Sequence, residues 1–203
     1  QLDLTDLRAR HTVPHVLSLL EGSEDADVAL ARELLAAWDY RADAAAAAPC
    51  LYYPFLDRFP TLKFVRRVLE DEVLTLLPGG APGLNLSDIA HYTDPNGAWA
   101  NHREVLVDVV RATMAEVVQR VRSSLGEPSE WQWGALHQVN FWHTLRKHDT
   151  WSHMQAGPDP QGGGPTTLGM AMHMGPGPGR EEDAPGEIPC RVYHGPAYRL
   201  IVD

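Results

Sequence analysis

Cysteine is scarce in this sequence, because Cys50 and Cys190 are the only two among 203 residues. Two cysteines are too few for a cysteine-based zinc finger, which needs a cluster of such ligands. Each follows a proline, in APCLYY and IPCRVY. The pair would form a disulfide in an oxidising compartment and two buried thiols in a reducing one. The residues alone leave both alternatives open.

Long apolar runs and an excess of positive charge are also missing. No stretch of about 18 apolar residues is present, so the sequence predicts no membrane-spanning segment. There are 17 basic side chains against 27 acidic ones, which gives a formal net charge of −10. A surface of that sign repels phosphate backbones, and nucleic acid is therefore not an expected partner.

The first two-thirds of the chain has the apolar spacing of α-helices. Helices are predicted over 23–39, with Ser23 or Asp25 as the N-cap, over 49–59 and 61–77, and over 102–121. In the last of these, the apolar face comprises Leu106, Val109, Val110, Thr113, Met114, Val117 and Val121. The GEPSE stretch is expected to end this helix near residue 128.

Beyond residue 128 the apolar spacing changes to a period of two, which predicts strands. In LHQVNFWH, one strand face carries His137, Val139, Phe141 and His143. In TLGMAMHMG, the predicted core face consists of Leu168, Met170, Met172 and Met174, with His173 pointing away. The CRVYHGPAYRLIVD stretch is a third predicted strand. The glycine- and proline-rich stretches QAGPDPQGGGP and GPGPGREEDAPGE are predicted loops.

These patterns predict an α+β fold that forms one folding unit over residues 1–203. Residues 1–128 would supply the helices, and residues 129–203 a few antiparallel strands and the glycine- and proline-rich loops. The strands are too few and too apolar to be stable in water without a helical layer. No flexible linker is therefore expected near residue 128.

Four clustered histidines, His137, His143, His148 and His153, are the first candidates for a metal site. Strand spacing places the first two on one face but about 20 Å apart, whereas a metal needs imidazoles that converge at roughly 2 Å. Methionines beside His173 could hold a soft copper ion, but the interpretation of that strand as core is favoured. We therefore predict no metal ligands, and expect histidines that hydrogen-bond in and around a sheet.

Signatures of catalysis are missing too. No serine occupies a GxSxG elbow. The GGG at 162–164 is not followed by the lysine of a phosphate-binding loop, and YTDPNG lacks the acidic spacing of a calcium loop. The residues alone predict no catalytic residue in this chain and leave its substrate-binding residues unknown.

Four stretches in order resemble the penicillin acylase (penicillin amidase) family. They are LLAAWDYRADAAAAAPCLY, WQWGALHQVNFWH, QGGGPTTLGMA and HGPAYRLIVD, and together they span nearly the whole chain. The sequence departs from the family pattern at Tyr40, where glycine is usual, at Ala197, where serine is usual, and in its two cysteines. The resemblance implies that WQWGALHQVNFWH is a scaffold strand of the layered αββα fold, in which Gly134 lets a neighbouring element approach closely.

The resemblance also implies an activity. Members of the family are N-terminal nucleophile hydrolases, in which a self-exposed serine attacks an amide carbonyl and its own α-amine acts as the base. An asparagine and backbone N–H groups stabilise the oxyanion. The expected substrates are acylated amines such as penicillins, cephalosporins or acyl-homoserine lactones. Such enzymes are typically periplasmic or secreted, which favours a Cys50–Cys190 disulfide.

None of the family's catalytic groups can be carried over to this chain. Gln1 is not a nucleophile, so we expect a C-terminal portion of the β subunit. Its partners would be the α subunit and the N-terminal part of the β subunit, and the family's calcium ligands would lie upstream. The alternative is a non-catalytic helical protein-interaction domain whose likeness to the family is accidental.

Overall fold

The computed structural model describes residues 3–58, 64, 67–68, 89–141, 156–173, 190 and 192–195. Its contacts divide the chain into two compact units, each assembled from separate segments. Unit 1 consists of Gln1–Leu7, Asp39–Cys50 and Val121–Asp203, and unit 2 of Arg8–Trp38 and Leu51–Arg120. None of the four boundaries between these segments falls at residue 128. The prediction of a single folding unit stays a prediction.

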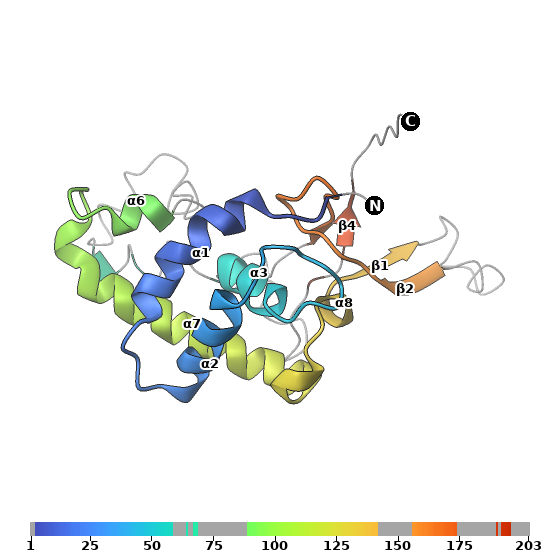
Figure 1. Cartoon of the computed structure of the whole chain (residues 1–203), viewed down its shortest axis with the longest axis horizontal. Helices are drawn as coiled ribbons and strands as arrows, with labels where there is room; N and C mark the ends of the chain where they lie inside the picture. Colours follow the sequence, from blue (N-terminus) through green and yellow to red (C-terminus); the bar gives the residue numbers. More distant parts are fainter. Residues whose placement is uncertain are drawn as a thin grey trace. The chain divides into compact units, whose positions relative to one another are not determined.

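The described residues of unit 2 are mainly helical, as predicted (Figure 1). The helices that lie wholly or largely in it are α1 (Leu7–Leu20), α2 (Ala26–Ala36), α3 (Pro49–Arg58), α6 (Ile89–Thr93), η2 (Ala100–His102) and α7 (Arg103–Leu125). Asp25 caps α2 as predicted, because its carboxylate accepts from the N–H groups of Asp27 and Val28. A helix at residues 61–77 was also predicted, but nearly all of it lies outside the described residues.

The long helix α7 confirms the predicted apolar face. All seven of its predicted members are buried: Leu106, Val109, Val110, Thr113, Met114, Val117 and Val121. Arg111 donates through Nε to the carbonyl of Leu19 at 3.0 Å, and so ties α7 to the end of α1. The structure also contains α1 itself, which the sequence analysis did not predict separately and which includes Pro14 on an exposed position.

The described part of unit 1 contains a small sheet. The elements of this described part are η3 (Pro128–Glu130), α8 (Trp133–Leu136), β1 (Gln138–Phe141), β2 (Ala156–Pro160), β3 (Met172–His173) and β4 (Val192–His194). The strand order is β2-β1-β4-β3. The pairs β1–β2 and β3–β4 are antiparallel as predicted, whereas β1 and β4 are parallel. The fold is α+β.

Three details of the strand prediction are wrong. The segment before Gln138 is not strand, because the backbone N–H groups of Trp133 and Gly134 donate to Ala46 O and Ala44 O and α8 forms there. The predicted loop at 156–160 is instead the strand β2. Its five residues are all exposed, and β2 ends the strand order, where proline is tolerated because no further ladder bond is needed.

The third error concerns the methionine strand. The alternation is present, but the buried positions are Thr167, Gly169, Ala171 and His173. Leu168 is 77% exposed, and Met170 and Met172 are only partly buried. The small side chains at the other buried positions leave room for the imidazole of His173. Period-two spacing shows which residues share a face of the strand, but it does not show which face is buried. Met174 lies outside the described residues.

Candidate functional site

An aromatic and imidazole cluster forms the centre of unit 1. Trp133 is fully buried, and its Nε1–H donates to Gly163 O at 2.9 Å. Its ring stacks on His137 with 4.4 Å between centroids, and His173 meets both rings edge-on. The cluster joins α8 to β3. Trp133 and His137 therefore serve packing, as the resemblance implies for the stretch that contains them.

Both ring nitrogens of His137 face backbone carbonyls. Nδ1 lies 2.7 Å from Gln161 O, and Nε2 lies 3.2 Å from Ala171 O. Burial lowers the pKa of His137 to about 4, so the ring is neutral near pH 7 and carries one proton. The shorter contact favours that proton on Nδ1. A neutral ring enclosed in this way positions chain segments and does not exchange protons with a substrate.

The predicted absence of a metal site is only partly addressed by the structure. Within the ranges given above, no group of three His, Cys, Asp or Glu side chains could hold a metal ion. His143, His148 and His153 lie outside those ranges, and His137 is committed to carbonyl contacts. The absence of metal ligands stays a prediction.

Gly134 allows the close approach that the resemblance implies. A Cβ built at this position would lie 2.8 Å from Cβ of Pro160 and 2.9 Å from Cβ of Ala44. Real Cβ atoms essentially never come so close, so the neighbouring backbone would have to move. Gly134 therefore lets α8 pack against β2 and the 44–46 segment at once.

Gly134→Ala is expected to lower the free energy of unfolding by about 1–3 kcal/mol, because the added methyl overpacks this contact. Urea denaturation of both proteins measures the difference. Gly195→Ala is the matched control, since the nearest described atom to its added Cβ is 3.9 Å away, and its expected change is within about 0.5 kcal/mol. Equal stability of the Gly134 variant and the parent would contradict the packing role.

Both cysteines are buried in the structure, and no disulfide joins them. Burial raises the pKa of the Cys50 thiol to about 12, so this side chain carries no thiolate near neutral pH and is a poor nucleophile. The Cys50–Cys190 bridge that the exported location favours stays a prediction.

We expect no free thiols in denatured, unreduced protein purified from an oxidising compartment. A bridge closing a loop of roughly 140 residues could stabilise the fold by about 4–5 kcal/mol through the unfolded chain. Thiol titration in denaturant is the measurement, because the folded chain shields both groups. The same protein after reduction should give two thiols, and two thiols before reduction would rule the bridge out.

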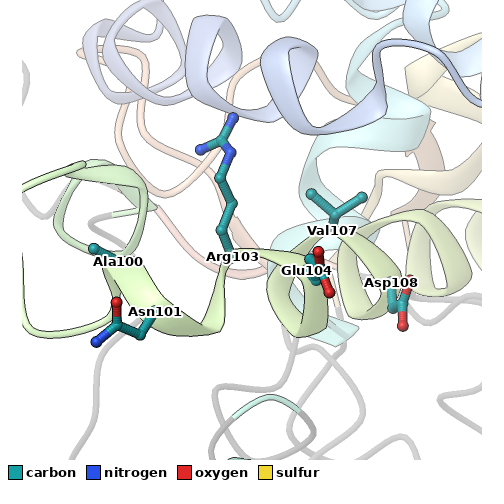
Figure 2. A pocket seen from close by; sticks show the side chains of 6 residues that line it. All are labelled: Ala100, Asn101, Arg103, Glu104, Val107 and Asp108. Atoms are coloured by element: carbon teal, nitrogen blue, oxygen red, sulfur yellow. The ribbon is translucent and has the colours of Figure 1, made fainter.

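The described residues of unit 2 contain two neighbouring cavities near the start of α7. One, of 430 Å³, is lined by residues of α1, α6 and the turn that follows α6. The other, of 740 Å³, runs along the first turns of α7 (Figure 2). Ala100 and Arg103 line both. Of these residues the sequence analysis considered only those of YTDPNG, as a rejected calcium loop, because the lining comes from helices far apart in the sequence and carries no motif.

One hydroxyl–imidazole pair lies at the smaller cavity. Thr93 Oγ1 is 2.8 Å from His15 Nδ1, a spacing that a nucleophile and its base would have. The same hydroxyl donates to Ala90 O at 3.2 Å. The hydroxyl has a single proton, so it accepts from Nδ1–H of His15 when it donates to Ala90 O, and it donates to Nδ1 only in the other tautomer of His15. The absence of catalytic residues from this chain stays a prediction.

None of the described helices combines the length and the apolarity that crossing a bilayer requires. No curated protein matches this sequence. A sequence model of the penicillin amidase family matches residues 1–203, which is the full length of the chain. On that match, the chain belongs to the penicillin amidase family.

Proposed function

We propose that this chain is the C-terminal portion of an amide hydrolase that removes an acyl group from an amine, and that it supplies scaffold. The observation that carries the proposal is the match of the penicillin amidase family over residues 1–203. The buried cluster around Trp133 and His137 also supports a scaffold role, because its rings stack and the indole N–H bonds to a backbone carbonyl.

The proposed chemistry depends on residues outside this chain. A serine hydroxyl at the start of the β subunit attacks the amide carbonyl while the free α-amine of the same residue takes up its proton. The amine leaves, and water then releases the acid from the serine ester. Oxyanion donors stabilise the negative charge that develops on the carbonyl oxygen. Substrates of this class include β-lactam antibiotics and acyl-homoserine lactones.

The same proposal covers partners, location and calcium. The partners are the α subunit and the N-terminal part of the β subunit, and the location is the periplasm or the exterior of the cell. Among the described residues, no three acidic, histidine or cysteine side chains gather that could hold calcium. We propose, from the family resemblance alone, that the calcium ligands of the family lie upstream of this chain.

Residues 1–203 alone are expected to show no hydrolysis of chromogenic acyl anilides above background, whereas the longer, self-processed protein is active. Loss of a nucleophile together with its base can lower kcat by about 10⁶-fold, because these groups act as a unit. The measurement compares both proteins on phenylacetyl, glutaryl and long-chain acyl anilides.

The variant that tests this most sharply is Thr93→Val, which removes the hydroxyl beside His15. It should leave the activity of the longer protein unchanged. Turnover by residues 1–203 that is lost in Thr93→Val would overturn the scaffold assignment. An inactive but correctly processed longer protein would overturn the proposed amide hydrolysis.

A further inference from the structure

Arg103 is a cation without a partner in the part of the chain that the structure describes. It is the first residue of α7, it is exposed, and it lines both cavities. Neither an ion pair nor a hydrogen bond joins its guanidinium to another described residue. Figure 2 shows its side chain extending from α7 toward α1, whose residues His15 and Ser18 line the smaller cavity with it.

The smaller cavity combines this cation with an apolar wall. Tyr92, Pro95 and Ala100 supply the wall. The ring of Tyr92 packs against the rings of Phe64 and Trp99, with 5.8 Å and 5.6 Å between centroids, and these contacts fix its position. Cavities of about 300–1,000 Å³ with apolar walls and a few polar groups are typical small-molecule sites, and this one has a volume of 430 Å³.

The polar groups at the cavity are already oriented. The hydrogen bond between Thr93 and His15 joins α6 to α1 across it. Ser18 Oγ donates to His15 O at 2.8 Å, so its proton is also committed. Arg103 therefore has the uncommitted donors, and a guanidinium presents two parallel N–H groups to a carboxylate.

The charge balance around Arg103 limits the ligand to one negative charge. Asp94 lines the same cavity, and Glu104 lines the adjoining one. Arg103 is the one unpaired cation among the described lining residues, so a dianion such as phosphate would be repelled by these carboxylates more strongly than a monoanion. A carboxylate with an apolar body matches both the single cation and the apolar wall.

We propose that the cavity between α1, α6 and the start of α7 binds a small organic monocarboxylate. Its carboxylate pairs with Arg103, and its apolar body lies against Tyr92 and Pro95. The site is separate from amide hydrolysis and does not depend on the proposed function, because it uses none of the groups that such chemistry requires.

The test is a chemical-shift titration of the full chain with benzoate, benzamide and inorganic phosphate. Benzoate should bind with a Kd on the order of 1 mM, as expected for a ligand of this size, and should shift the amide signals of Thr93 and Arg103. Benzamide has the same shape without the charge and should bind about tenfold more weakly or worse. Phosphate should also bind about tenfold more weakly than benzoate or worse.

Two variants separate charge from shape. Arg103→Gln removes the cation from an exposed side chain, and Ala100→Phe fills the cavity; each should weaken benzoate binding by about tenfold or more. Arg32→Gln changes the net charge by the same amount at an exposed position of α2, and this variant should bind benzoate as tightly as the parent does. Glu104→Gln removes a carboxylate from the adjoining cavity and should bind benzoate at least as tightly as the parent does.

Several results would overturn the assignment. They are the absence of saturable shifts up to about 20 mM benzoate, an unchanged Kd in Arg103→Gln, and phosphate or benzamide binding as tightly as benzoate. Circular dichroism and thermal melting of each variant establish that lost binding does not reflect lost folding. If Ala100→Phe is unfolded, the comparison of Arg103→Gln with Arg32→Gln decides the question.

Discussion

Replacing Trp133 by alanine is expected to lower the free energy of unfolding by about 3–5 kcal/mol. The side chain is fully buried and stacks on His137. Its removal would leave a cavity at the centre of unit 1 and would deprive Gly163 O of its indole donor. Urea denaturation followed by circular dichroism gives the difference from the parent.

Two further substitutions separate the parts of this effect. Trp133→Phe keeps an aromatic ring but loses the N–H group, and should cost about 1–2 kcal/mol. Leu168→Ala removes a side chain that is 77% exposed, and should change stability by no more than about 0.5 kcal/mol. A loss below about 1 kcal/mol in Trp133→Ala would contradict the packing role of this cluster.

Mild acid is expected to destabilise the fold through His137, with a loss of about 3 kcal/mol between neutral pH and about pH 4. Burial lowers the pKa of His137 in the folded chain from 6.5 to about 4. Between these values the unfolded chain binds a proton that the folded chain does not, so the free energy of unfolding falls as the pH falls. Above pH 6.5 the ring is neutral in both states and the full stability is present.

The neighbourhood of His137 supports this direction. Burial is the largest cause of the lowered pKa of His137. The carbonyls of Gln161 and Ala171 raise the pKa, because they favour the charged ring, whereas the nearby His173 lowers it. The measurement is urea denaturation at several pH values between about 7 and 4.5. His137→Gln cannot take up a proton at this position, so its stability should depend less steeply on pH. His91→Asn alters an exposed imidazole and should retain the slope of the parent.

An equal pH dependence in the parent and in His137→Gln would show that other groups cause the acid loss. A steeper dependence in the variant would contradict the assignment directly. Both outcomes concern the slope of the free energy of unfolding against pH. The slopes can therefore be compared even though the variant is less stable than the parent at every pH.

Local chemistry determined the parts of the fold that the sequence predicted correctly. The face of α7 follows from a period of 3.6 sustained over some twenty residues. The start of α2 follows from the carboxylate of Asp25, which lies within reach of the first free N–H groups of the helix. The start of α3 follows from Pro49, whose fixed φ and missing N–H suit a first helical position. Each signal lies within a few residues of the feature it sets.

The sequence by itself therefore determined the α+β class, the starts of α2, α3 and α7 and, through its motifs, the penicillin amidase family. Only the tertiary structure decided the helix α8, the strand β2 and the burial of His173. Trp133 begins α8, and its backbone N–H donates to Ala46 O. This partner is far away in the sequence, so no local sequence window contains it. The cavity around Arg103 has the same origin, since it forms only where α1, α6 and α7 come together. Periodicity states which residues share a face, whereas the identity of the opposing segment decides which face is buried and which side chains meet.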